Sequence, residues 1–336
     1  MGRYRGRKHE SIRSTPMSAF WTGRQVLVTG GSGFLGSAVL AQLAARGADR
    51  VVCAESADHD LRDPTAVADL FAASEPELVI HLAARVGGIG ANQARPADLY
   101  LDNLLMGTYV IDEARRRDTP KVVVVGTICS YPKFTPVPFQ ESSLWQGYPE
   151  ETNAPYGIAK LAQLVQLQSN RAQYGQNGIY LMPTNLYGPG DKFHAAVSHV
   201  IPALVKKCVE AREAGDDHIE VWGTGSASRE FLYVDDAAEG IALAAERYDG
   251  AEPVNLGSNH EMPIRELVDE VVVATGFTGE VRWDDTKPDG QPRRRVDATR
   301  AREEFGFEAH TSFADGLRRT VEWYLANREA AEARDH

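Results

Sequence analysis

The chain carries Arg24-Gln-Val-Leu-Val-Thr29 followed at once by Gly30-Gly31-Ser32-Gly33-Phe34-Leu35-Gly36, and this run sets its architecture. The apolar β-branched residues predict a short buried strand, and the amphipathic residues from Ser37 to Arg46 predict a helix. Glycine at position 30 would permit a tight turn, at 33 it would let backbone amides approach a pyrophosphate, and at 36 it would let the helix pack closely on the strand. A strand, a glycine turn and a helix in this order predict dinucleotide binding.

Four further apolar strands follow in the N-terminal half. They are Arg50–Ala54, Leu78–Leu82, Lys121–Val125 and Gly178–Met182, and helical segments alternate with them. This alternation predicts an α/β fold with a Rossmann-type doubly wound parallel sheet. Beyond residue 190 the periodicity is lost and Gly, Asp, His and Arg increase, which predicts a smaller C-terminal α/β substrate domain.

The predicted boundaries follow from these changes in pattern. We expect the NAD(P)-binding domain at residues 20–190, with returning segments near 229–258, and the substrate domain mainly at 191–328. Residues 1–19 are basic and polar and would form a disordered tail, and residues 329–336 would form a frayed one.

Charge and cysteine content exclude several functional classes. A net charge of −11 over 336 residues argues against a general nucleic-acid-binding protein. The three cysteines, Cys53, Cys129 and Cys208, are far apart and odd in number, so they suggest neither a disulfide framework nor a metal-ligand cluster. No apolar run approaches the roughly 20 residues of a membrane helix. We expect a cytoplasmic protein that binds no nucleic acid, membrane or metal.

Side chains after the second and third strands suit the adenosine end of a dinucleotide. Glu55 follows the second strand about 20 residues after the glycines, where an acid can hydrogen-bond ribose hydroxyls and repel a 2′-phosphate. This favours NAD over NADP, although Arg85 could still reach a phosphate. Asp60 and Leu61 open a loop suited to the adenine edge. His81 ends a buried strand and is expected to be a hydrogen-bonded core residue.

A second constellation follows the fourth strand. Thr127 and Cys129 come just beyond its carboxyl end, where open α/β sheets bind their ligands. Tyr156 and Lys160 are four residues apart on a predicted helix, so their side chains share one face. An ammonium beside a phenol would lower the tyrosine pKa from about 10 towards neutrality, as proton exchange with a sugar hydroxyl or ketone requires.

Six short motifs carry a family likeness. They are His81-Leu-Ala-Ala-Arg-Val-Gly-Gly88, Cys129 before Tyr131-Pro132-Lys133, Pro183-Thr-Asn-Leu-Tyr-Gly-Pro189, Ser198-His-Val-Ile-Pro-Ala-Leu204, Arg229-Glu-Phe-Leu232 and Lys287-Pro-Asp-Gly290. With them, the chain from Phe20 to about Arg328 resembles the GDP-L-fucose synthases, which are extended short-chain dehydrogenases/reductases. The resemblance implies an enzyme that epimerises C3 and C5 of GDP-4-keto-6-deoxy-D-mannose and then reduces C4 with NAD(P)H.

The resemblance also implies which residues act. Cys129 and His199 match the acid/base pair that moves the C3 and C5 protons, and ordinary thiol and imidazole pKa values of about 8.5 and 6.5 suit that exchange. Tyr156, activated by Lys160, would protonate the C4 oxygen, and Thr127 would replace a serine beside it. The implied substrate-binding residues are Val86, Gly87, Asn185, Val200, Lys207, Trp222, Arg229 and Lys287. The implied cofactor-binding residues are Gly30, Gly33, Phe34, Leu35, Gly36, Glu55, Asp60, Leu61, Ala83, Ala84, Arg85, Asn103, Tyr156, Lys160, Pro183, Leu186 and His199.

Cofactor choice and net reaction stay open at this point. The family resemblance implies NADP, whereas Glu55 favours NAD. A resident NAD would make a redox-neutral GDP-mannose 3,5-epimerase credible, but the sequence 198–202 resembles the fucose synthases. A non-catalytic cofactor-binding regulator is a distant alternative. The resemblance also implies a homodimer formed through helices at residues 98–116 and 152–174.

Overall fold

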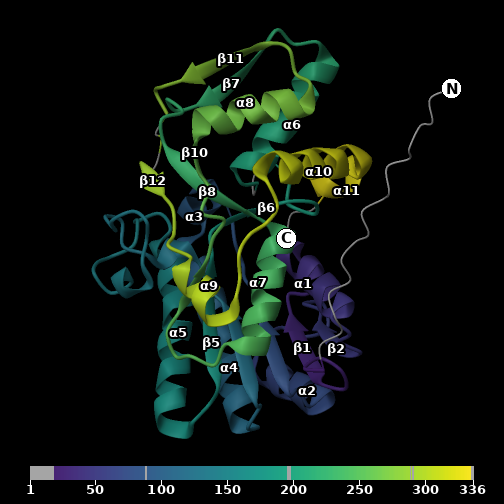
Figure 1. The fold of residues 1–336 in the computed structure, drawn as a ribbon, viewed down its shortest axis with the longest axis vertical. Helices are drawn as coiled ribbons and strands as arrows, with labels where there is room; N and C mark the ends of the chain where they lie inside the picture. Colours follow the sequence, from purple (N-terminus) through teal and green to yellow (C-terminus); the bar gives the residue numbers. More distant parts are fainter. Residues whose placement is uncertain (1–18, 88, 195–197, 288, 290, 334–336) are drawn as a thin grey trace, which may run out of the picture.

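A computed structural model describes residues 19–87, 89–194, 198–287, 289 and 291–333. Residues 1–18 of the predicted basic tail lie outside these ranges. A large sheet with helices on both sides occupies the lower part of Figure 1, and a smaller group of strands and helices occupies the upper part. The predicted α/β fold class is confirmed.

The large sheet is parallel and has the strand order β2-β1-β3-β4-β5-β9. Its strands are β1 (Gln25–Thr29), β2 (Arg50–Ala54), β3 (Leu78–His81), β4 (Lys121–Val125), β5 (Gly178–Pro183) and β9 (Val254–Leu256). Thr29, the last residue of β1, is in register with Ala54 of β2 on one side and His81 of β3 on the other. The strand order therefore reverses at β1, and doubly wound sheets bind ligands at such a switch point. This arrangement confirms the predicted doubly wound sheet.

Helices cover both faces of this sheet. One face is covered by α1 (Phe34–Ala45), α7 (Val234–Arg247) and α9 (Thr299–Phe305), and the other by α2 (Pro64–Ser74), α4 (Pro96–Arg116) and α5 (Ala154–Tyr174). Along β1, Val26 and Val28 join the first core and Leu27 joins the second. Because both faces are buried, the strands are apolar runs without polar alternation, which is why they were recognisable from the sequence.

The upper unit holds a third core. Its sheet contains β6 (Asn185–Tyr187), β8 (Ser228–Tyr233), β10 (Glu261–Pro263) and β12 (Arg293–Arg294), and a separate parallel pair joins β7 (His218–Trp222) to β11 (Glu280–Asp284). The core is built by α6 (Val200–Ala214), α8 (Ile264–Thr275) and α10 (Phe313–Ala326). Strand β8 continues directly into α7, so the chain returns from the upper unit to the large sheet at Tyr233.

Two short helices depart from the sequence-based expectations. Helix α3 (Ile89–Ala94) was not predicted, and residues that we expected to fray form α11 (Arg328–Ala333). Ala331 is fully buried, and the Arg328 guanidinium pairs with Glu213 of α6 and with Glu332. These tertiary contacts order the segment, and local sequence does not reveal them. Residues 334–336 lie outside the described ranges.

Two other expectations concern the core and the membrane. His81 is fully buried and its Nδ1 lies 2.8 Å from Thr29 Oγ1, which confirms it as a hydrogen-bonded core histidine. Burial holds the pKa of His81 well below its usual value, so the ring is neutral. Within the described ranges, no helix combines the length and apolarity that crossing a bilayer requires.

Candidate active site

The glycine turn has the geometry that the sequence predicted. Gly30 adopts φ +73°, and a Cβ there would lie 2.7 Å from the backbone nitrogen of Ala83, just past β3. A Cβ at Gly36 would overlap the Gly30 carbonyl oxygen and the Gly31 backbone. Both positions therefore need glycine, and the turn lies against the segment after β3 with the N-terminus of α1 beside it.

Glu55 is half-buried immediately after β2. Its Oε1 accepts a hydrogen bond from the Cys53 thiol at 3.3 Å, and its carbonyl accepts from the amides of Asp58 and His59. The burial of Cys53 and its contact with Glu55 raise the pKa of the thiol, so Cys53 remains a proton donor. Residues 55–60 contain three carboxylates and no lysine or arginine, so an acid with a defined orientation stands at the predicted ribose position.

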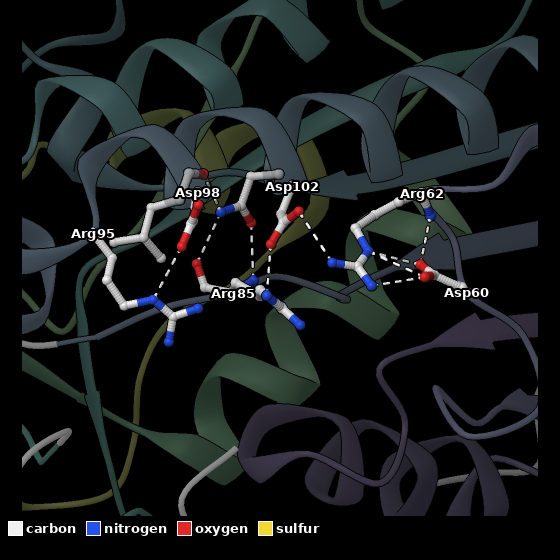
Figure 2. A network of polar contacts seen from close by, with 8 residues as sticks. Asp60, Arg62, Arg85, Arg95, Asp98 and Asp102 are labelled. Atoms are coloured by element: carbon white, nitrogen blue, oxygen red, sulfur yellow. Dashed lines mark hydrogen bonds and ion pairs between the residues drawn. The ribbon is translucent and has the colours of Figure 1, made fainter.

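Two arginines near this segment are already paired with carboxylates (Figure 2). Arg62 contacts both oxygens of Asp60, with Nε at 2.8 Å from Oδ1 and Nη2 at 2.7 Å from Oδ2. Asp102 of α4 accepts hydrogen bonds from both arginines, from Arg62 Nη1 at 3.3 Å and from Arg85 Nη1 at 2.7 Å. The Arg62 guanidinium lowers the pKa of Asp60 to about 2, so Asp60 stays ionised. The four charges cancel.

Asn103, a predicted cofactor-binding residue, is almost wholly buried and bound within the protein. Its Oδ1 accepts from the Arg85 amide at 3.0 Å, and its Nδ2 donates to the carbonyls of Arg85 and Leu99. The side chain therefore fixes the segment after β3, which Figure 2 shows beneath α4.

Thr127 and Cys129 lie together at the carboxyl end of β4. Thr127 Oγ1 caps a short 3-10 helix (Ile128–Ser130) by accepting the Cys129 amide at 3.1 Å. A Cβ at Gly157 of α5 would lie 2.5 Å from the Cys129 carbonyl oxygen, and Ser130 Oγ donates to the Gly157 carbonyl at 2.8 Å. Glycine at 157 thus lets α5 press its first turn against Cys129.

Tyr156 and Lys160 belong to that first part of α5, as predicted. Lys160 is fully buried, its Nζ donates to the Val125 carbonyl at 3.0 Å, and burial lowers its pKa to about 8. Burial raises the pKa of Tyr156, the nearby Cys129 adds to that increase, and a hydrogen bond from Thr127 opposes it. The expectation that Lys160 lowers the tyrosine pKa is therefore wrong for this structure, because desolvation dominates. The structure does bring Thr127, Cys129 and Tyr156 within interaction range of one another.

Sequence reasoning missed Arg294 of β12. Its Nη1 lies 3.8 Å from Cys129 Sγ, and its Nε donates to Gln291 Oε1 at 3.1 Å. Arg294 is 165 residues from Cys129 in the sequence. The only available sequence signal was its closeness to the Lys287 motif.

His199 lies at the N-cap of α6. Its side chain remains accessible, while the surrounding protein and the positive charge of Lys192 lower its pKa. Asp191 precedes it in the same connection and is almost fully buried, and its Oδ1 accepts a hydrogen bond from the Lys192 amide at 2.7 Å. Burial raises the pKa of Asp191 to about 7. That His199 pairs with Cys129 stays a prediction.

Most predicted substrate residues belong to the upper unit. Trp222 is 66% exposed at the end of β7, and Lys287 Nζ lies 5.6 Å from its ring centroid. Lys207 Nζ donates to the Glu220 carbonyl at 2.7 Å. Arg229 on β8 is half-buried, donates to the Ser228 and Asp289 carbonyls, and has its pKa lowered to about 10 by burial and by the charge of Arg294.

The remaining predicted residues are distributed along the edges of both sheets. Asn185 Nδ2 donates to the Glu230 carbonyl at 2.8 Å and so joins β6 to β8. Phe34 and Leu35 begin α1, Leu61 is buried in the α2 side of the core, Ala83 and Ala84 follow β3, Pro183 ends β5, Leu186 lies in β6 and Val200 begins α6. Val86 and Gly87, also after β3, are accessible.

These groups suit proton transfer next to a carbonyl and hydride transfer from a nicotinamide. A thiol, two hydroxyls and a buried ammonium gather at one strand end of a dinucleotide-binding sheet, and cations with an exposed indole lie in the upper unit. The glycine turn and Glu55 fit a dinucleotide, because the close backbone packing at Gly30 and Gly36 brings the N-terminus of α1 to the end of β1, and an acid follows β2.

Comparison with known proteins agrees with this geometry. The family model described as "NAD dependent epimerase/dehydratase family" matches residues 26–257. GDP-L-fucose synthase 1 of Arabidopsis thaliana is 42% identical, with 95% of this chain and 98% of the relative covered. GDP-L-fucose synthase of Escherichia coli K12 is 39% identical, with 91% and 98% covered. A GDP-L-fucose synthetase from Naegleria fowleri bound to NADP superimposes with a TM-score of 0.85 at 29% identity, covering 93% and 97%. The chain belongs to the NAD-dependent epimerase/dehydratase family.

Proposed function

We propose that this protein converts GDP-4-keto-6-deoxy-D-mannose to GDP-L-fucose by epimerising C3 and C5 and reducing C4. The observation that carries the proposal is the convergence of Thr127, Cys129 and Tyr156, with Lys160 behind them, at the carboxyl end of β4. Relatives support the proposal, because GDP-L-fucose synthases are about 40% identical to this chain over more than nine tenths of its length.

The epimerisation uses the acidity of hydrogens next to the C4 ketone. Cys129 removes a ring proton, and the electrons of the broken C–H bond move onto the C4 oxygen, where the hydroxyls of Thr127 and Tyr156 stabilise the charge. His199 returns a proton to the other face of the ring. The lowered pKa of His199 leaves the imidazole mostly neutral at pH 7, so proton return is expected to slow as the pH rises.

The reduction uses the same hydroxyls. The hydride for C4 would come from a nicotinamide held by the dinucleotide-binding residues. Tyr156 donates its proton to the C4 oxygen, and its raised pKa keeps it protonated and ready to donate. Lys160, fixed by the Val125 carbonyl, provides positive charge behind the phenol as that proton leaves. Arg229, Lys207 and Lys287 bind the diphosphate, and Trp222 stacks on the base.

We also propose that NAD(H) is preferred over NADP(H). A 2′-phosphate would face the Glu55 carboxylate, and Arg62 and Arg85 are neutralised by Asp60 and Asp102. We expect NAD⁺ to bind at least about fivefold more tightly than NADP⁺, because like charges a few ångströms apart repel by about 1 kcal/mol or more. Fluorescence titration of the full chain measures both affinities, and tighter binding of NADP⁺ would refute the preference.

The proposed setting is a homodimer in a reducing, cytoplasmic compartment. The three cysteines are all free, as such a compartment permits. The dimer would form through α4 and α5, which pack together and leave Leu101 and Val165 52% and 45% exposed.

The decisive experiment supplies the keto-sugar in deuterated water with NADH or NADPH. Oxidation of one cofactor per sugar, with deuterium at C3 and C5 of a 6-deoxyhexose, is the expected result. A Cys129→Ser variant should stop deuterium entry while cofactor binding remains. Deuterated epimers formed from GDP-mannose without added reductant would instead identify a redox-neutral 3,5-epimerase, and failure on both sugars despite cofactor binding would favour a regulator.

A further inference from the structure

Arg294 approaches the Cys129 sulfur with a fixed orientation. Strand β12 pairs in parallel with β8, so that Arg294 stands in register with Arg229. The Arg294 side chain is held at Nε by Gln291 Oε1, and Gln291 Nε2 donates in turn to the Lys133 carbonyl at 2.8 Å, beyond Cys129 in the chain. With Nε held, Nη1 is directed at Cys129 Sγ, 3.8 Å away.

The charge of this guanidinium is not neutralised by a carboxylate. The adjacent Arg293 pairs with both oxygens of Glu261, at 2.8 and 2.6 Å. Over the residues that the structure describes, no carboxylate lies within ion-pair distance of Arg294 or of its neighbour Arg229. Burial is the main cause of the lowered pKa of Arg229, the charge of Arg294 adds to it, and the charge of Asp289 opposes it. The Cys129 sulfur is the group toward which the Arg294 guanidinium is directed.

We propose that Arg294 is a positioning residue that fixes the Cys129 sulfur with its guanidinium and stabilises the negative charge on that sulfur when it acts on the sugar ring. The part of this inference that concerns the sugar rests on the proposed function. The part that concerns the thiol does not. A cation close to sulfur favours the thiolate over the thiol. In the reaction the thiolate takes the proton from C3 or C5, the C–H electrons form the enolate, and sulfur becomes a neutral thiol. Arg294 keeps its protons throughout, so its role is electrostatic.

The test measures how fast iodoacetamide alkylates Cys129 between pH 6 and pH 10, with the Cys129 peptide followed by mass spectrometry in the full-length protein. Because only the Cys129 peptide is followed, alkylation of Cys53 and Cys208 does not contribute to the measured rate. The variants are Arg294→Ala and Arg294→Lys. Arg293→Ala is the matched control, because it removes a guanidinium from the same strand, but one that is already paired with Glu261.

We expect Arg294→Ala to slow alkylation at pH 7 by about threefold or more. Each tenfold loss of thiolate is partly offset by an approximately threefold gain in nucleophilicity of the more basic sulfur. The rate curves should therefore cross, with the variant equal to or faster than wild type at pH 10. Arg294→Lys should restore most of the rate at pH 7, and Arg293→Ala should follow wild type.

Two results would overturn the inference. One is an Arg294→Ala curve that coincides with wild type, and the other is a variant slower by the same factor at every pH, which indicates altered access to sulfur. Deuterium exchange into the sugar gives an independent reading and should fall at pH 7 and recover at higher pH in Arg294→Ala. If alkylation behaves as expected but no GDP-sugar exchanges, the proposed reaction fails and the Arg294–thiolate pair stands.

Discussion

Lys160 and Tyr156 stand four residues apart on α5, and burial shifts their pKa values in opposite directions. Desolvation disfavours the charged form of each group, so the lysine pKa falls to about 8 and the tyrosine pKa rises. The ammonium donates to the Val125 carbonyl instead of the phenol. The spacing placed both residues on one helix, as the structure has them, but it predicted the wrong direction for the tyrosine pKa. A sequence pattern contains no information on the solvent that surrounds each group.

Replacing Tyr156 by phenylalanine separates the two half-reactions. Tyr156→Phe removes the proton donor for the C4 oxygen, so we expect reduction to fall by about 10²–10⁴-fold. Deuterium exchange at C3 and C5 should fall less, because in the proposed mechanism the Thr127 hydroxyl would still stabilise charge on that oxygen. Cofactor oxidation and deuterium incorporation, measured on one sample, give both rates. Equal losses of the two would mean that Tyr156 acts mainly in binding the sugar.

Asp191 predicts a distinctive pH dependence of stability. Its pKa of about 7 in the folded protein exceeds the value of 3.8 that applies to an exposed aspartate. Between about pH 4 and 7 the folded state therefore holds a proton that the unfolded state has lost, so this residue makes the free energy of unfolding decrease as the pH rises through that window. Asp191→Asn removes the titration, and we expect the variant to be more stable than wild type at pH 8, by up to about 4 kcal/mol.

Urea unfolding at pH 4.5 and pH 8 measures this effect. The two proteins should be similar at the lower pH and diverge at the higher one. Asp269→Asn, at an exposed position on α8, is the control and should change neither value. A pH dependence that is identical in wild type and Asp191→Asn would show that Asp191 is ionised at pH 7 in the folded chain.

Among whole elements, those of the large sheet were recognisable from local sequence and the short ones were not. The run Lys121–Val125 is apolar and β-branched except for Lys121, and both its faces are buried, so composition alone identified β4. Strand β12 has two residues, Arg293 and Arg294, and exists through its pairing with β8, which lies more than sixty positions earlier. Propensity over two residues carries no such information. Arg294 was missed as a site residue for the same reason.

The N-terminal turn of α1 supplies a test of element packing. Gly36→Ala would place a methyl group on the Gly30 carbonyl and the Gly31 backbone, which cannot move as a flexible side chain can. We expect α1 to shift away from the turn, with a loss of about 1–3 kcal/mol of stability and weaker NAD⁺ binding. Ala41→Gly, on the exposed side of α1, should reduce stability by about 1 kcal/mol and leave NAD⁺ affinity unchanged. Normal NAD⁺ affinity in Gly36→Ala would refute close packing at this turn.

For the whole molecule, the outer surface of α4 and α5 is the face that most needs a partner. Pro96, Ala97 and Tyr100 of α4 and Ala154, Pro155 and Ile158 of α5, together with Tyr148, line a shallow apolar hollow of about 400 Å³. Farther along the same helices, Leu101 and Val165 are exposed. Apolar side chains along two adjacent helices are typical of a surface that a second copy covers.

Charge on this surface should therefore separate the two copies. We expect the double variant Leu101→Glu with Val165→Glu to convert a dimer to a monomer. In a twofold interface each substituted position occurs once in each copy, so the two substitutions would bury four carboxylates in an apolar interface, which is unfavourable. Sedimentation velocity at micromolar concentration measures the mass. Val273→Glu is the matched control, since Val273 is 79% exposed on α8 of the upper unit, and it should leave the dimer intact. Persistence of the dimer in the double variant would locate the interface elsewhere on the chain, and a monomeric wild type would remove the proposed dimer altogether.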